Sequence, residues 1–309
     1  MVLNDIRNIL QNLNQARNWS LQILQIKNLK RSGTVYTGRE ITLDPVGRLE
    51  DFVDEISEYY VGVKGCFDSK FASLSDYDGS ANGRTIYKLD GAGDLIASEY
   101  SSLIESLANP NSEDDPFEMV ARASVLIGQF EKEDEIIPIK LFSMQNPITM
   151  LKHRFMRNNG CFKELDEKVL TLRPTIDVLI YGSEVYLFTL NGENLFNMER
   201  SYKALCCDYI ARVQETGMIV NAENFSSIAS SGHNPRRFVS FNQAHLDKLK
   251  NASTRGRIAK KFSIPLKDGK FDTAQEGVSE KMVKILCDKG MVDPFENLPM
   301  EVPSAKKWE

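Results

Sequence analysis

The chain has 309 residues, of which 42% are hydrophobic and 26% are charged, a composition typical of a globular protein with room for two modest domains. Its formal net charge is −5. The first twenty residues are too polar for a signal peptide, and no apolar run approaches the ~18–20 residues that a membrane-spanning helix needs. We therefore expect a cytoplasmic protein that reaches a membrane only through a partner.

The first half is predicted to form mainly strands. Apolar residues at three- and four-residue spacing predict helices over 3–13, over 45–60 after Asp44-Pro45, and over 94–107. β-rich runs between turn signals predict strands. These strands cover residues 21–26, 35–36, 85–89, 120–130 and 136–142.

The second half begins with a hairpin signal and continues as helices. Two β-rich runs within 177–188 flank the turn Gly182-Ser183. The segments with a helical pattern are 194–217, 222–229, 235–249, 255–261 and 279–287; 262–264 is strand-like and 300–305 reads as extended. The predicted fold class is α+β, a sheet-forming N-terminal half packed with a helix-rich C-terminal half. We place an N-terminal α+β region at 1–117 and a C-terminal α+β domain at 118–309.

No catalytic or metal-binding motif is present. The stretch Gly79–Thr85 resembles a phosphate loop but has one residue too few between its glycines, lacks the lysine and precedes a strand. No serine lies in a GxSxG elbow, and the acidic residues lack the clustering of a two-metal site. The five cysteines form no CxxC pair. We therefore predict no catalytic residue, no metal and no cofactor.

A basic block spans residues 236–270. It holds ten Lys and Arg against Asp247 and Asp268, a charge of 10 − 2 = +8, which leaves −5 − 8 = −13 on the rest of the chain. Such a block indicates an anionic partner, although a solvated surface balanced by acidic neighbours is the alternative. The candidate DNA-contacting residues are Arg236, Arg237, Arg255, Arg257, Lys260, Lys261, Lys267 and Lys270. A second, smaller basic patch comprises Lys152, Arg154 and Arg157.

The composition of the block favours contact with the phosphates of duplex DNA. Small residues would let the backbone approach a phosphate, and a helix start at Ser253-Thr254 would add free N–H donors. Aromatic residues are scarce in the block, and we interpret Phe238, Phe241, Phe262 and Phe271 as core residues at its edges. This scarcity argues against a stacking platform for single-stranded nucleic acid. Five to eight phosphate contacts predict a slope of log K against log salt of roughly −4 to −7.

The order of these features over about residues 120–309 resembles the B subunit of the Kiwa anti-phage defence system. The resemblance is carried by the hairpin run 177–188, by Asn194-Leu195-Phe196 before a long helix, by the basic stretch 251–262, and by the ending from 285–288 to Val302-Pro303-Ser304. The chain has Phe196-Asn197 where a Phe-Glu pair is expected. No residue role is transferred, because none of these residues aligns with a functional motif.

The resemblance implies a cytoplasmic homodimer that binds double-stranded DNA in antiviral defence, works with a small multipass membrane subunit at the inner membrane, and has no established nuclease site. Together with the basic block, it gives our leading hypothesis, a non-enzymatic DNA-binding effector. A metal-dependent nuclease whose acidic residues assemble only in the fold is a second hypothesis. A scaffold whose basic face meets acidic protein or anionic lipid is a third.

Overall fold

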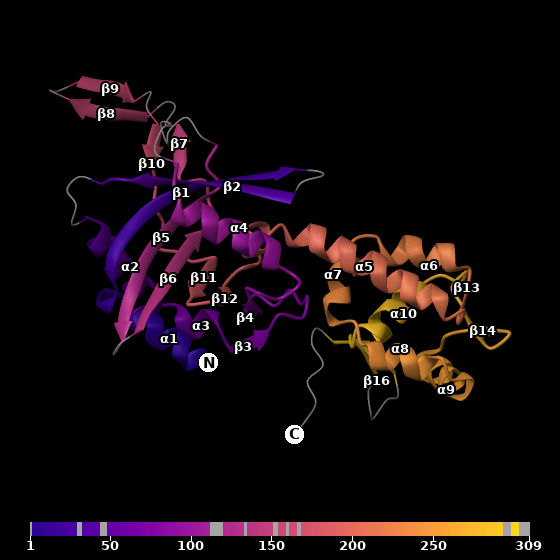
Figure 1. Cartoon of the computed structure of the whole chain (residues 1–309). Helices are drawn as coiled ribbons and strands as arrows, with labels where there is room; N and C mark the ends of the chain where they lie inside the picture. Colours follow the sequence, from indigo (N-terminus) through magenta and orange to yellow (C-terminus); the bar gives the residue numbers. More distant parts are fainter. Residues whose placement is uncertain are drawn as a thin grey trace. The chain divides into compact units, whose positions relative to one another are not determined.

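In the computed structural model the chain folds into two compact units (Figure 1). The structure describes residues 2–29, 33–43, 48–111, 120–132, 135–150, 154–158, 161–165, 168–292 and 298–302. The first unit, here the sheet unit, comprises Met1–Asp76 and Gly83–Asn197; the second, the helical unit, comprises Tyr77–Asn82 and Met198–Glu309. The division after Asn197 lies well beyond the predicted boundary at 117/118, because the strands that follow residue 118 pair with those that precede it.

The sheet unit is built on an eight-stranded sheet with the order β2-β1-β5-β6-β11-β12-β4-β3. Neighbouring strands are antiparallel, except β3 and β4, which are parallel. The strands are β1 (Arg17–Leu29), β2 (Gly33–Ile41), β3 (Ser73–Asp76), β4 (Thr85–Asp90), β5 (Ala123–Lys132), β6 (Glu135–Ser143), β11 (Val178–Tyr181) and β12 (Glu184–Leu187). The predicted strands between residues 21 and 188 all contribute to this sheet, and the α+β class is confirmed.

Helices α1 (Leu3–Gln11) and α2 (Arg48–Val61) cover one face of this sheet (Figure 1). Ile6 of α1 and Tyr60 of α2 are buried in one core with Leu179 of β11. Each such side chain contributes about 1.5–3 kcal/mol by leaving water. Leu21 of β1 belongs to the same core. Because side chains alternate between the two faces of a strand, the next residue, Gln22, points to the opposite face of the sheet. There its Nε2 donates to Leu107 O of α4 (Ala97–Ala108) at 3.1 Å.

The remaining elements of the sheet unit are short. They are η1 (Leu13–Gln15), α3 (Phe67–Lys70), η3 (Leu190–Asn194) and two antiparallel pairs, β7 (Ile148–Met150) with β10 (Lys168–Leu170) and β8 (Arg154–Asn158) with β9 (Cys161–Leu165).

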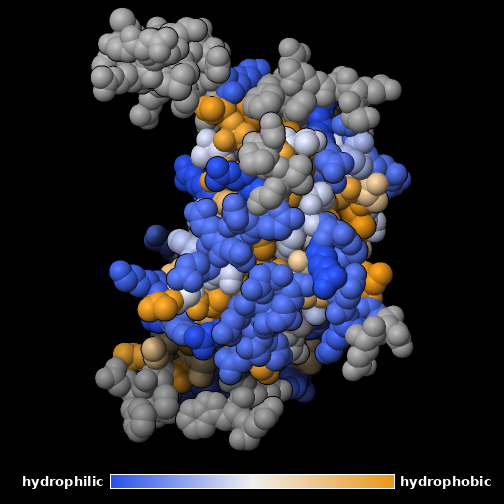
Figure 2. Space-filling view, turned by 90° about the vertical axis from the view of Figure 1, so that its left-hand side faces the viewer, coloured by the Kyte–Doolittle hydropathy of each residue, from blue (hydrophilic) through white to orange (hydrophobic). Residues whose placement is uncertain are grey.

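Figure 2 shows that hydrophilic side chains predominate on the face it presents, with the exposed apolar residues in small separate groups.

The hairpin β11–β12 forms at the predicted turn. Gly182 occupies the first central position with φ of 61°, a left-handed conformation that glycine adopts without steric cost. The strands on either side are buried at Val178 and Val185. Turn chemistry and strand pattern therefore agree here, which is why the sequence located this hairpin correctly.

The helical unit consists of several helices and a small three-stranded sheet. Its elements are α5 (Met198–Glu215), β13 (Ile219–Val220), α6 (Ala222–Ala229), α7 (Asn234–Arg237), η4 (Phe238–Ser240), α8 (Gln243–Leu249), α9 (Ala252–Phe262), β14 (Leu266–Lys267), β15 (Lys270–Asp272), α10 (Val278–Leu286), β16 (Gly290–Val292) and β17 (Pro299–Glu301). The sheet order is β13-β15-β14. The core includes Phe225, Phe271 and Met282, all fully buried.

Two sequence predictions in this unit are wrong. The single helix over 235–249 is broken into α7, η4 and α8, because the backbone extends at Phe241 and Asn242 and the Asn242 side chain then caps α8 by accepting from His245 N at 3.2 Å. The strand over 262–264 does not form. Ser263 instead takes φ of 51° and Ile264 N donates to Ala259 O at 2.8 Å, which ends α9 as a left-handed C-cap.

Candidate nucleic-acid interface

The basic block folds largely as α9 and the hairpin β14–β15. Asn251 caps α9, since its Oδ1 accepts from Ser253 N at 2.9 Å and from Thr254 N at 3.2 Å. The expectation that these two N–H groups would be free donors for a phosphate is therefore wrong. These two N–H groups are therefore not available to a phosphate.

Arg255 holds two parts of the helical unit together. Its Nη1 donates to Leu249 O at 3.0 Å and to Lys250 O at 2.8 Å, which are the end of α8. Its Nε donates to Gly269 O at 2.8 Å, in the turn of the β14–β15 hairpin. Because all three bonds use the guanidinium, Arg255 holds the hairpin against the end of α8 and so positions the basic surface.

We predict that Arg255→Ala lowers stability by about 2 kcal/mol, because three backbone carbonyls lose a charged donor. Urea denaturation followed by circular dichroism would measure this loss. Lys248→Ala, which removes an exposed cation on the neighbouring helix, is the matched control and should leave stability unchanged within about 0.5 kcal/mol. An Arg255→Ala protein as stable as the control would contradict the positioning role.

The exposed cations of α9 are Arg257, Lys260 and Lys261. Their spacing of three and four residues places them on one side of the helix. Among the residues that the structure describes, none forms a hydrogen bond or ion pair with these side chains. Three adjacent cations without a protein counter-charge repel one another, and an anion would relieve that repulsion.

The β14–β15 hairpin adds two more exposed cations. Lys267 and Lys270 are direct cross-strand partners, and like charges placed opposite each other destabilise a strand pair. Asp268 and Gly269 connect them with φ of 53° and 72°, the pattern of a two-residue Asp-Gly turn. The sequence reasoning chose both lysines but missed the Asp-Gly signal, which would have located the hairpin.

The side chains of Arg236 and Arg237 form hydrogen bonds within the helical unit. Arg236 Nε donates to Tyr77 Oη at 2.9 Å and its Nη2 donates to Ser80 O at 3.0 Å. Arg237 Nη1 donates to Asn234 Oδ1. Both side chains are half-buried, so these two predicted contact residues are engaged elsewhere and are not grouped with α9.

The second predicted basic patch is described only in part. Lys152 lies outside the described residues. Arg154 and Arg157 lie in β8, in register opposite Leu165 and Phe162 of β9.

The predicted aromatic anchors are mostly buried. Phe238 and Phe271 are fully buried and Phe262 is 7% exposed. Phe241 packs against the core and stacks on Tyr209 with ring centroids 4.0 Å apart.

The sequence did not indicate the role of Lys281. Its Nζ donates to Phe262 O and Ser263 O at 3.3 Å each and thereby provides hydrogen-bond partners for the carbonyls at the end of α9.

Gly256 offers a way to strengthen α9 without altering its charges. Its φ is not in the left-handed region, and a Cβ built there meets no atom within 4 Å. We expect Gly256→Ala to stabilise the protein by about 0.5–1 kcal/mol, because glycine inside a helix costs conformational entropy. A shift of the urea midpoint to lower concentration would contradict this.

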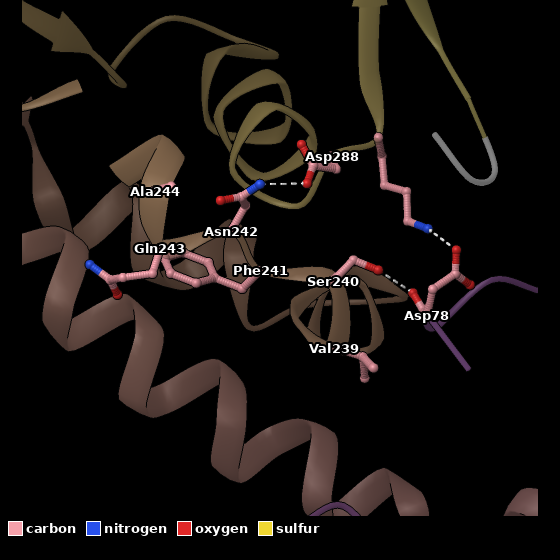
Figure 3. A pocket seen from close by; sticks show the side chains of 9 residues that line it. Asp78, Val239, Ser240, Phe241, Asn242, Gln243, Ala244 and Asp288 are labelled. Carbon is pink, nitrogen blue, oxygen red and sulfur yellow. Dashed lines mark hydrogen bonds and ion pairs between the residues drawn. The ribbon is translucent and has the colours of Figure 1, made fainter. Parts of the chain in front are cut away.

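The loop Tyr77–Asn82 belongs to the helical unit although it joins β3 to β4. Lys289 Nζ lies 3.0 Å from Asp78 Oδ2 and donates to Ser80 Oγ at 3.0 Å. Burial alone raises the pKa of the Asp78 carboxyl, but hydrogen bonds from Ser80 and Lys289 outweigh it and hold the pKa below its usual value. Ser240 Oγ donates to the carbonyl oxygen of Asp78, and both residues line a cavity of about 480 Å³ together with Asn242 and Asp288 (Figure 3).

No group of three or more His, Cys, Asp or Glu side chains is placed to hold a metal ion within the described part of the chain. In the same residues, no helix combines the length and the apolar character needed to span a membrane.

The comparison with protein families identifies the chain. No curated protein and no solved structure matches it. The family model described as Kiwa protein KwaB-like matches residues 124–293, more than half of the chain, so the chain belongs to this family. It is therefore a component of a Kiwa anti-phage defence system and acts with other subunits of that system. The matched range includes α9 and both strands of the basic hairpin.

Proposed function

We propose that the chain is a non-enzymatic DNA-binding effector of Kiwa defence that contacts the phosphates of duplex DNA through α9 and the β14–β15 hairpin. The observation that carries the proposal is the set of exposed cations without protein partners among the described residues. These are Arg257, Lys260, Lys261, Lys267 and Lys270. Arg255 supports them by tying the hairpin to α8. Phosphate contacts of this kind give affinity without sequence preference.

The setting of this function is also proposed. The effector would work in the cytoplasm as a homodimer, and a small multipass membrane subunit of the same system would recruit it to the inner membrane. The basis for this setting is family membership.

The experiment is to incubate the purified protein with covalently closed plasmid and with a labelled duplex, each with and without magnesium. We expect binding that leaves both DNAs intact in either condition. Magnesium-dependent loss of closed plasmid, abolished by a metal chelator, would favour a metal-dependent nuclease instead. A protein that binds heparin but does not bind duplex DNA would favour a scaffold for acidic protein or anionic lipid.

A further inference from the structure

A small apolar cavity lies beside the basic face of α9. It has a volume of about 260 Å³ and is formed by α8, α9, the end of α10 and the start of β16. Ile258, Phe262 and Ile285 supply apolar surface to it. The volume lies below the ~300 Å³ at which pockets for drug-sized ligands begin, so the cavity suits one group of modest size.

Two exposed cations, Lys248 and Arg257, also line this cavity. Neither side chain has a hydrogen-bond or ion-pair partner among the described residues. Arg257 belongs both to the cavity lining and to the row of cations with Lys260 and Lys261. The cavity therefore opens onto the surface proposed to follow the phosphates.

A polar group lies in the same lining. The Nδ1 atom of His245 lies 3.1 Å from Asp288 Oδ1, which fixes the ring and leaves Nε2 without a partner among the described residues. Thr254 contributes a hydroxyl. An apolar site with a few polar groups and a cationic rim matches a nucleotide, which has a flat base, polar edges and an anionic phosphate.

We propose that this cavity receives one unpaired base of a DNA strand whose neighbouring phosphates lie on Lys248 and Arg257. The inference rests on the proposed function and specifies its substrate. A base in a fully paired duplex is stacked and paired and would have to leave the duplex before it could enter. The favoured DNA is therefore a duplex with a single-stranded extension or a frayed end.

Gly290 provides a variant that fills the cavity. Its φ is not in the left-handed region, and a Cβ built there lies 3.4 Å from both Ile285 Cγ1 and Phe262 Cε1. Gly290→Leu therefore places its side chain among the groups that would hold the base, without removing a charge. Gly83→Leu is the matched control, because Gly83 is exposed and its Cβ meets no atom within 4 Å.

The test compares three labelled DNAs by fluorescence anisotropy at one salt concentration. The first is a duplex closed at both ends by ethylene-glycol linkers, the second carries a short single-stranded extension, and the third carries that extension with abasic sites. We expect the second to bind about tenfold tighter than the other two. Gly290→Leu should remove this advantage, and Gly83→Leu should retain it.

Equal affinity of the wild-type protein for the closed and the extended DNA would overturn the base-binding proposal and leave duplex binding intact. An abasic extension that binds as tightly as the normal one would also overturn it, without any variant. Deoxynucleoside monophosphates are a further probe: binding of them alone, with no advantage for the extension, would assign the cavity to free nucleotides. Failure of all three DNAs to bind would instead count against the proposed function.

Discussion

Reversal of three charges on α9, in the variant Arg257→Glu, Lys260→Glu, Lys261→Glu, is expected to abolish duplex binding at moderate salt. Each phosphate contact contributes about −0.9 to the slope of log K against log salt, so removing three should reduce the slope by about 3. Reversal also places carboxylates against the phosphates, so the loss should exceed a hundredfold. Titration of a labelled duplex would measure both quantities.

The matched control reverses three exposed lysines of the sheet unit, Lys27→Glu, Lys64→Glu and Lys132→Glu. Both variants change the net charge by −6, from −5 to −11, so they repel DNA equally at long range. We expect the control to retain most of the affinity. Equal losses in the two variants, with native circular dichroism spectra, would show that net charge and not the α9 surface governs binding.

Lys289→Met is expected to cost about 3 kcal/mol of stability. The lysine side chain is 6% exposed and its Nζ lies 3.0 Å from Asp78 Oδ2, whose side chain is 25% exposed. Methionine leaves the partly buried carboxylate without its counter-charge, and breaking a buried pair is destabilising by about 3–5 kcal/mol. Urea denaturation would measure the change.

The double variant Asp78→Asn, Lys289→Met provides the control, because it removes both charges and should recover part of the loss. A pH series gives a second check. The folded-state pKa of Asp78 is lowered, so the pair stabilises above the unfolded pKa of about 3.9 and this contribution is lost as pH falls through the lower folded value. The stability of Lys289→Met should therefore depend less on pH over that acid range than the stability of the wild type. An equal pH dependence of the two proteins would contradict the assigned role of the pair.

Much of the fold could be predicted from the sequence because local signals agreed with the tertiary structure. The β-rich run over 136–142 predicted β6, and Gly182 marked the β11–β12 turn. The block of cations was visible as a charge asymmetry. These features depend on neighbouring residues only.

The division of roles within the block depends on contacts that local sequence does not encode. Arg255 and Arg257 lie on the same helix, yet Arg255 bonds to three carbonyls and Arg257 is exposed. Similarly, Asp78 and Lys289 are 211 residues apart, so their pairing could not be predicted from spacing. The apolar cavity beside Arg257 also requires the packing of four elements.

The most direct test of the central claim is the salt dependence of binding to a closed duplex. Five phosphate contacts, from Arg257, Lys260, Lys261, Lys267 and Lys270, predict a slope of log K against log salt of roughly −4 to −5. A slope in that range, with the DNA intact in magnesium, would agree with a phosphate-contacting effector. Absence of binding at low salt, or a slope near zero, would contradict it.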